Sequence, residues 1–343
     1  MTTGHTMDCR TYPAENLKHM FVDIVQKKRI DAGERPALRA VFHKVHGAAR
    51  GILRMRPGVP EQLRVGLFAL RELPAWVRFS SDIPPRAPDF KSTLGIAVKL
   101  FGVDGPKLIG NPTDTTMDLL MQNHDVFFTA TATDMCEFTQ AGVIDGDYEP
   151  YLQAHPTTAA ILGDMAKPVA SVLGTPYWSI VPFRLGENRV VKYKLAPAVE
   201  DPPLSETPND RNYLGKDLVA RLGTAHARFE LTVQPQTDPA VMPIDDATTR
   251  WEETQSPPIP VADLLLPRQD ITVAGQAEFA ENLAFNIWRV PAEHAPLGSI
   301  GQARRIAYQA SADQRRTVNG VTLNEPSSPD PAADAAQPSR ELA

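Results

Sequence analysis

Residues 296–320 constrain the fold most strongly, because they have the start and stop signals of one long helix. Gly298 and Ser299 supply a flexible start and an N-cap hydroxyl, and Asn319 with Gly320 supplies a C-terminal stop. No proline interrupts the sequence between them. We therefore predict a helix of about five turns.

Four side chains share one face of this predicted helix, namely Arg304, Tyr308, Ser311 and Arg315. Their spacings of four, three and four residues place the phenol between two guanidinium groups. Nearby positive charge and donated hydrogen bonds favour the ionised form of a phenol, and a tyrosinate is a hard anionic ligand for ferric iron. The face predicts either an iron-ligating tyrosine or, more simply, a packed tyrosine with solvated arginines.

Short apolar segments make up much of the remaining chain. They are rich in valine, phenylalanine and leucine and are separated by proline, glycine and aspartate, which is typical of antiparallel strands. The predicted strands cover residues 38–55, 75–80, 95–101, 125–129, 177–183, 189–195 and 227–234. Further helices are predicted at residues 15–30, 63–70 and 134–141. The expected class is therefore α+β.

Composition excludes several classes of function. The formal net charge of −6, with no basic cluster longer than residues 27–29, argues against a nucleic-acid partner. No apolar run reaches membrane-spanning length, and the N-terminus lacks a signal pattern, so we expect no membrane insertion and a cytoplasmic protein. Cys9 and Cys136 have no metal-ligand spacing, and reduced thiols are the expected state. The apolar helix at residues 15–30 suggests a homodimer.

Five stretches, in chain order, resemble the haem catalases. They are AWVRFS at residues 75–80, GIAVKLF at 95–101, NHDVFF at 123–128, ENLAF at 281–285 and RRIAY at 304–308. The first three are similar to the VRFS, GFAVKFY and NTPVFF segments of catalases, and the last to the motif that carries their proximal tyrosine ligand. The chain is short for a catalase and is most similar to the small catalase-related haem proteins of bacteria.

The resemblance implies a fold and a domain organisation. It implies an eight-stranded antiparallel β-barrel with surrounding helices and a C-terminal proximal helix, with haem b and its iron between helix and barrel. An N-terminal arm at residues 1–14 would precede one domain at 15–324. That domain would comprise a barrel core at about 38–234, a wrapping segment at 235–277 and the proximal helix region at 278–320. Residues 325–343 have few bulky apolar side chains and are expected to form a disordered tail.

The resemblance also implies roles for individual residues. Tyr308 would be the axial iron ligand, with Arg304 donating a hydrogen bond to it. Arg39 and Arg78 would pair with the haem propionates, because a guanidinium fork fits a carboxylate. Arg315 is favoured over its neighbour Arg316 as the further arginine, since it shares the tyrosine face. Asn123 matches the distal asparagine, which would hydrogen-bond a peroxide oxygen.

The segment that should carry the distal histidine departs from the catalase pattern. Counting from Arg39 without a gap, Phe42 occupies the histidine position, whereas a one-residue deletion would place His43 there. On a regular strand Phe42 and His46 would point to one face and His43 to the other, unless a bulge intervenes. We favour His43 as the catalytic base. Leu94 also departs, because catalases have an arginine before the corresponding glycine.

Three functions are compatible with this pattern. The first is a haem-dependent oxidoreductase that uses hydrogen peroxide or an organic hydroperoxide on an unknown organic substrate, as a peroxidase or monooxygenase with or without weak catalase activity. The second is a fatty-acid hydroperoxide isomerase or dehydratase, similar to the catalase-like allene oxide synthases. The third is a non-catalytic haem-binding protein.

Overall fold

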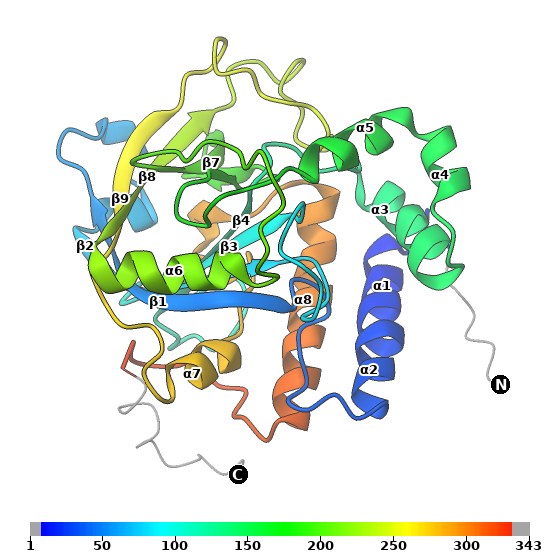
Figure 1. Cartoon of the computed structure of the whole chain (residues 1–343). Helices are drawn as coiled ribbons and strands as arrows, with labels where there is room; N and C mark the ends of the chain where they lie inside the picture. The colour runs from blue at the N-terminus through cyan, green and yellow to red at the C-terminus, as the bar shows by residue number, and fades with distance from the viewer. Residues whose placement is uncertain (1–7, 331–343) are drawn as a thin grey trace, which may run out of the picture.

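A computed structural model describes residues 8–330, and its strands form one closed antiparallel barrel (Figure 1). The strands are β1 Lys44–Met55, β2 Glu72–Ser81, β3 Leu94–Phe101, β4 Thr116–Gln122, β5 Tyr177–Trp178, β6 Phe183–Leu185, β7 Arg189–Pro197, β8 Ala227–Pro235 and β9 Ile259–Leu266. Their order is β5-β4-β3-β2-β1-β9-β8-β7-β6, and pairing of β5 with β7 closes the ring. The short β6 also pairs with β7, so the ring itself has eight strands. The predicted eight-stranded antiparallel barrel is confirmed.

Apolar side chains fill the barrel. Val77 and Phe79 on β2 alternate with neighbours that point outward, as the period of a strand requires. Phe79 packs against Tyr177 and Phe229, with ring centroids 6.5 and 6.4 Å apart. An eight-stranded ring is just wide enough for side chains to fill it. The interior of the ring is therefore filled by the hydrophobic core.

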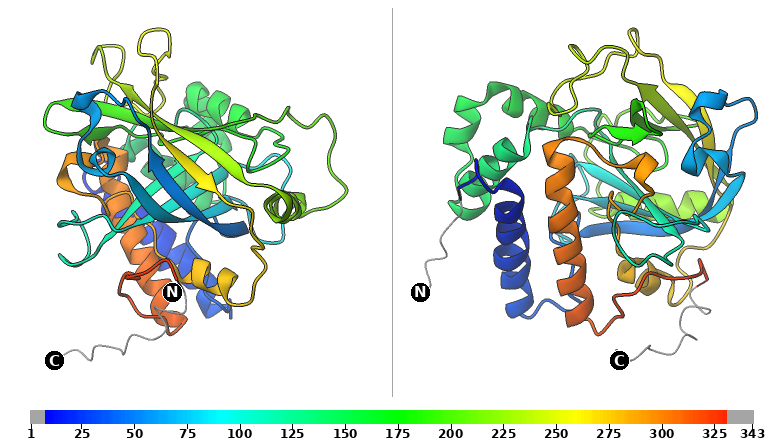
Figure 2. Two further views of the ribbon diagram at one scale, coloured as in Figure 1. Left: turned by 90° about the vertical axis from the view of Figure 1, so that its left-hand side faces the viewer. Right: turned by 180° about the vertical axis from the view of Figure 1, so that it is seen from behind.

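Helices surround the barrel, and most of them lie at one side (Figure 2). They are α1 Pro13–Lys18, η1 His19–Gln26, α2 Lys27–Asp31, η2 Glu61–Leu63, η3 Gly66–Ala69, α3 Ala132–Thr139, η4 Gln140–Ile144, α4 Glu149–Ala154, α5 Pro156–Met165, α6 Tyr213–Thr224, α7 Gln276–Asn282, η5 Ala292–His294 and α8 Gly298–Val318. The predicted long helix is thus present as α8. It lies between the barrel and the continuous helical stretch formed by α1, η1 and α2 (Figure 2).

The N-terminal helical stretch packs within its own chain. Leu17 and Met20 are buried together with Ala132, Cys136 and Ala303 from α3 and α8. The apolar side that suggested a homodimer is therefore at least partly covered by α3 and α8. The helix begins at Pro13, and residues 1–7 of the predicted arm lie outside the described residues.

Several predicted elements differ from the structure. Residues 125–129 form bends and turns instead of a strand, and residues 38–43 precede β1 in an irregular segment. The helix predicted at 63–70 is replaced by the short 3₁₀ turns η2 and η3. The strands β4 and β9 were missed. Because β9 completes the barrel within residues 259–266, the barrel extends beyond the predicted core at 38–234.

The segment after α8 is bound to the barrel. Glu325 is 3% exposed at its side chain and forms ion pairs with Lys99, at 2.6 Å, and with Arg289, at 3.1 Å. The Trp76 indole N–H donates to the carbonyl of Pro329 at 2.7 Å. Residues 325 and 329 of the predicted tail therefore contact the barrel, and residues 331–343 lie outside the described part of the chain.

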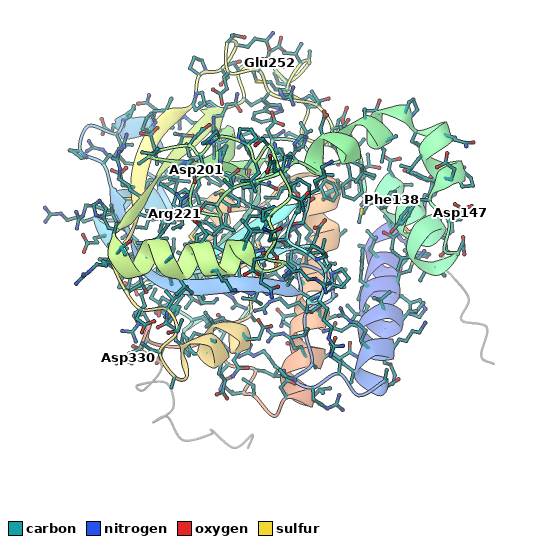
Figure 3. The ribbon with its side chains drawn as sticks, in the orientation of Figure 1. Phe138, Asp147, Asp201, Arg221, Glu252 and Asp330 are labelled. Atoms are coloured by element: carbon teal, nitrogen blue, oxygen red, sulfur yellow. A yellow bond between two sulfur atoms is a disulfide. The ribbon has the colours of Figure 1, made fainter. Side chains whose placement is uncertain are left out.

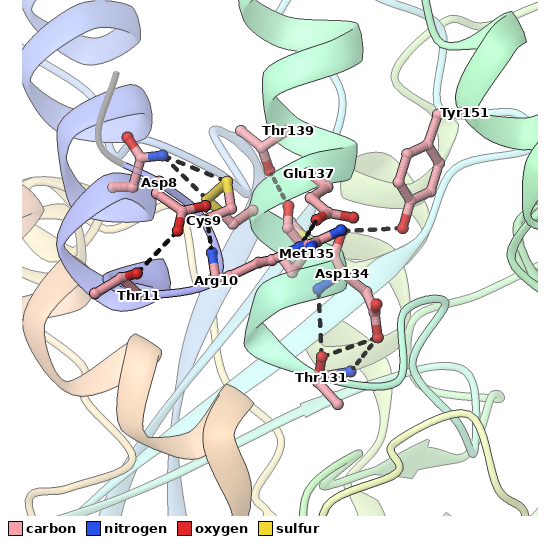
Figure 4. The surroundings of a disulfide bond; sticks show 12 residues. Asp8, Cys9, Arg10, Thr11, Thr131, Asp134, Met135, Glu137, Thr139 and Tyr151 are labelled. Carbon is pink, nitrogen blue, oxygen red and sulfur yellow. Dashed lines mark hydrogen bonds and ion pairs between the residues drawn. A yellow bond between two sulfur atoms is a disulfide. The ribbon is translucent and has the colours of Figure 1, made fainter. Parts of the chain in front are cut away.

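Cys9 and Cys136 form a disulfide, so the expectation of reduced thiols is wrong for this structure (Figure 4). The bond joins the turn before α1 to the buried middle of α3, across a sequence separation of 127 residues. The side-chain amide of Asn16 donates to both sulfur atoms, at 3.4 and 3.2 Å. Folding brings the two cysteines together because α1 and α3 pack side by side, which spacing along the chain could not indicate.

No helix within residues 8–330 combines the length and apolar character that crossing a membrane would require.

The disulfide predicts a measurable contribution to stability. Cys9→Ser should lower the free energy of unfolding by about 2–4 kcal/mol, because the crosslink restricts the unfolded chain. Urea unfolding monitored by circular dichroism would measure this loss, and a reductant should destabilise the wild type but not the variant. Two free thiols in freshly unfolded, unreduced wild type would contradict the disulfide.

A buried histidine predicts acid sensitivity. His294 is fully buried, accepts a hydrogen bond from the Leu67 N–H at 3.0 Å and contacts the Tyr193 hydroxyl at 3.1 Å. Burial lowers the pKa of His294 to about 4. The unfolded chain therefore binds this proton first as the pH falls below about 6.5, and stability decreases from there towards pH 4, by about 2 kcal/mol at pH 5. Urea unfolding at pH 7 and 5 should show a smaller loss for His294→Gln than for wild type. An equal loss in both would exclude His294 as a cause.

Candidate functional site

A cavity of about 590 Å³ lies outside the barrel, between its strands and α8. Residues from β2, β3, η1, α3, α4, α5 and α8 line it, and most of them are apolar. Five predicted site residues from three separate parts of the sequence share its wall, namely Arg39, Arg78, Arg304, Tyr308 and Arg315. Its size is in the range typical of sites for small molecules and cofactors.

The helix α8 positions a tyrosine and an arginine together on this wall. The Arg304 Nε–H donates to the Tyr308 hydroxyl oxygen at 3.1 Å, and the guanidinium lies 4.9 Å from the centre of the phenol ring. Residues four apart lie one above the other on a helix, so the predicted register brings this contact about. Arg304 Nη1 is buried and has no hydrogen-bond partner among the described residues. The pair presents a phenol oxygen already supported by one cationic donor.

Three arginines from another part of the cavity wall surround one partly buried carboxylate. The Glu281 carboxylate contacts Arg39 directly, Arg78 at 3.6 Å and Arg315 at 4.0 Å. Arg39 and Arg315 also each donate to the carbonyl of Leu283, at 2.7 and 3.1 Å. The contacts therefore hold the segment after α7 against both β2 and α8.

This arginine cluster, Arg39, Arg78 and Arg315 with Glu281, has surplus positive charge. Three guanidinium groups and one carboxylate leave a formal charge of 3 − 1 = +2, and no other carboxylate of the described chain forms an ion pair with these arginines. Burial and the nearby charge of Arg39 lower the pKa of Arg78 to about 9 and that of Arg315 to about 8. Burial alone would raise the pKa of Glu281, but the three arginines lower it. The cluster would therefore be stabilised by a ligand with negative charge.

Phe42, and not His43, contributes to the cavity wall. The Phe42 residue has φ of 56°, in the left-handed region that a bulky residue rarely adopts. The Arg78 guanidinium donates to the Phe42 carbonyl at 3.0 Å, and a Cβ on Gly95 would lie only 2.8 Å from the Phe42 ring. The absence of a side chain at Gly95 thus makes room for the ring.

His43 lies beside the cavity wall without belonging to it. Its Nε2 is 2.9 Å from the carbonyl of Ala40, and its Nδ1 is buried without a hydrogen bond within residues 8–330. Burial, followed by the positive charge of Arg29, lowers the pKa of His43. The structure therefore does not bring His43 together with Tyr308 on one wall.

His46 and Asn123 also have partners away from the cavity wall. His46 is the extra residue of a β-bulge, and its Nε2 lies 2.6 Å from the Ser81 hydroxyl. The Asn123 side-chain carbonyl accepts from the Leu94 N–H at 2.8 Å, which ties the start of β3 to the end of β4. The Asn123 Nδ2 is buried and has no partner in the described chain. Neither residue is among those that line the cavity.

Three features of the cavity and its surroundings were missed by the sequence analysis. Glu281 lies in the matched stretch ENLAF, but nothing in that stretch indicated that three distant arginines would meet there. Asp82 lines the cavity two residues after Ser80, so strand alternation from Arg78 could have indicated it. The helices α4 and α5 were not predicted at all, although Leu152 and Leu162 belong to the wall.

An apolar lobe extends the cavity into the helical part of the molecule. Its side chains come from η1 and from the α3 to α5 region, and they include Phe21, Met135, Phe138, Val143, Leu152 and Leu162. Figure 3 marks Phe138 within this part of the chain, where its ring also packs against Phe128 and Tyr148. The lobe can hold an apolar group away from water.

The described residues fit the haem that the sequence resemblance implies. Tyr308 offers an oxygen ligand, Arg304 supports it, and the surplus charge of +2 in the arginine cluster matches a cofactor with two carboxylates. The mostly apolar wall suits the flat apolar body of such a group.

Comparisons with known proteins agree on the fold. No protein-family model matches the chain, and no curated protein matches it. A bacterial catalase of known structure superposes with a TM-score of 0.67 at 18% identity, covering 88% of this chain and 63% of that one. A fungal catalase superposes with a TM-score of 0.65 at 19% identity, covering 85% of this chain and 63% of that one. This chain thus has the fold of catalases and matches less than two thirds of the length of either.

Proposed function

We propose that this protein binds haem b through Tyr308 and uses a peroxide as oxidant, as a relative of the small catalase-related haem proteins. One observation carries the proposal: a single cavity combines the Arg304–Tyr308 pair with an arginine cluster that has a surplus charge of +2. Bound haem would supply the ferric iron that takes up the peroxide oxygen and the electrons that break the O–O bond.

The residues of the chain would have separate tasks. Arg304 donates its hydrogen bond to the Tyr308 oxygen and so would hold the ligand atom in position. The arginine cluster orients the cofactor, because guanidinium groups bind carboxylates with defined geometry. The apolar wall excludes water from the reacting oxygen atoms.

The position of Phe42 favours organic hydroperoxides over hydrogen peroxide. No imidazole belongs to the cavity wall within the described residues, so a histidine base of the kind expected for fast reaction with hydrogen peroxide is missing there. The apolar lobe would hold the organic part of a larger hydroperoxide. The reaction would then be that of a peroxidase or monooxygenase.

A hydroperoxide isomerase or dehydratase is the second candidate, and the same Phe42 and apolar lobe favour it. The two classes differ in their need for a second substrate. A fatty-acid hydroperoxide that is consumed without any reductant or acceptor, with both oxygen atoms accounted for in its products, would identify the second class.

The first test of this function concerns the iron ligand. Purified protein should bind one haem b per chain with a high-spin ferric spectrum, and Tyr308→Phe should lose or change that spectrum because the ligand oxygen is removed. Absorption and electron paramagnetic resonance spectra would report this. Arg305→Ala, on the exposed side of α8, is the matched control. An unchanged spectrum in Tyr308→Phe would exclude Tyr308 as the ligand.

The second test concerns the arginine cluster. Arg39→Ala and Arg78→Ala should each weaken haem binding by about 1–3 kcal/mol, the usual size of a lost charge-assisted contact, and leave the spectrum of bound haem nearly intact. Competition for haem with apomyoglobin would measure the affinities. Equal affinity in wild type and both variants would show that the cluster does not bind the cofactor.

A further inference from the structure

A cavity that uses a hydroperoxide needs a group that moves a proton. For the O–O bond to break with release of an alcohol, the terminal oxygen of the hydroperoxide has to lose its proton and the leaving oxygen has to gain one. Phe42 cannot do this, neither His43 nor His46 lines the cavity, and the Nε2 atom of each contacts another partner. The proton carrier must therefore be another residue.

Only a few titratable side chains belong to the cavity wall in the described part of the chain. They are Arg39, Arg78, Asp82, Tyr148, Arg304, Tyr308 and Arg315. Arginines stay protonated as a rule, and Tyr308 is the proposed ligand. Burial raises the pKa of Tyr148, which keeps its proton more firmly bound. Asp82 is therefore the remaining candidate: it is the one carboxylic acid among the described residues that line the cavity, and no histidine lines it.

The backbone directs Asp82 towards the same space as the other site residues. Arg78, Ser80 and Asp82 alternate along β2 and its end, and all three line the cavity. Ser80 pairs with Gly95, and the Phe42 ring packs against Gly95. Asp82 is two residues after Ser80 and therefore comes next on the side of the strand that lies beside this ring. The Thr93 N–H donates to Asp82 Oδ1 at 3.1 Å and fixes the carboxyl group.

The carboxyl group of Asp82 is free of the ion pairs that neutralise other acids of this protein. Within residues 8–330 it forms no ion pair, whereas Glu281 is surrounded by three arginines. Asp82 is exposed as a residue, yet desolvation of its carboxyl group by the surrounding protein raises its pKa, against the opposing effect of the hydrogen bonds from Thr93. The nearest charged side chain on its own strand face is Arg78, which pairs with Glu281.

We propose that Asp82 is the proton-transfer group of this cavity. The inference rests on the proposed function. As a carboxylate, Asp82 takes the proton from the terminal oxygen of the hydroperoxide and returns it to the oxygen that leaves as an alcohol, so Asp82 gains and loses one proton. The haem of the proposed function supplies the electrons for O–O cleavage.

Removing the titrating group while keeping its shape tests this role. In haem-loaded Asp82→Asn, the stopped-flow reaction with cumene hydroperoxide should slow by about 100-fold or more, the usual scale of a general acid–base. The haem spectrum and affinity should stay unchanged. Asp104→Asn, an exposed aspartate outside the cavity wall, is the matched control and should react like wild type.

A gain of function provides an independent check. Phe42→His in the Asp82→Asn protein adds an imidazole to the same wall, and histidine tolerates the left-handed backbone better than phenylalanine does. This double variant should react with cumene hydroperoxide at least about tenfold faster than Asp82→Asn alone.

Binding of cyanide gives a readout that does not depend on turnover. Hydrogen cyanide binds to ferric haem as the anion and gives its proton to a base in the cavity. The affinity for cyanide in wild type should have an inflection above pH 3.9, the ordinary pKa of aspartate, and Asp82→Asn should lose it. An unchanged pH profile together with a wild-type rate would overturn the role of Asp82 and leave the proposed function intact. Failure of haem-loaded wild type to react with any hydroperoxide would overturn the proposed function, and this inference with it.

Discussion

The imbalance of charge around Glu281 is the constraint on which the candidate site depends. Three guanidinium groups from the segment before β1, from β2 and from α8 converge on one carboxylate. Buried charges of one sign repel each other, and here their burial lowers the pKa of Arg78 and Arg315 far below that of a free arginine. The contacts join the barrel to α8, so the cluster also defines the edge of the cavity. A dianionic ligand would relieve the repulsion and strengthen the same junction.

A second buried cluster shows how the protein balances charge elsewhere. Lys99, Arg289 and Arg316 meet Asp114, Asp118 and Glu325 between β3, β4 and the segment after α8. Among the described residues, these three cations and three anions balance in formal charge. Buried ion pairs are tolerated when each charge has a partner, and leaving one unpaired costs several kcal/mol. The arginine cluster departs from this rule, and its three arginines line the cavity beside α8. The contrast supports a ligand more strongly than the count of arginines alone.

Local periodicity explains which parts of the site could be predicted. Arg304, Tyr308 and Arg315 share a face because a regular helix repeats every 3.6 residues, and the spacing alone gave that register. Long-range features had no such signal. The disulfide joins residues 127 apart, and Glu281 meets Arg39 only after the barrel has closed. The predicted orientations of Phe42, His43 and His46 did not apply, for a local reason. The strand β1 begins only at Lys44 and contains a bulge at His46, so the side chains do not alternate regularly along this segment.

The position of Phe42 links the fold to the chemistry. Its left-handed backbone costs on the order of 1 kcal/mol or more, and such strain persists only where surrounding contacts hold it. Arg78 supplies one of those contacts, because the guanidinium that pairs with Glu281 also donates to the Phe42 carbonyl. The arginine cluster and the part of the cavity wall formed by Phe42 are thus linked through a single side chain. In the proposed function, the Arg78 guanidinium that would meet the cofactor is therefore the same group that contacts the Phe42 carbonyl, so cofactor binding and the shape of the Phe42 wall share one side chain.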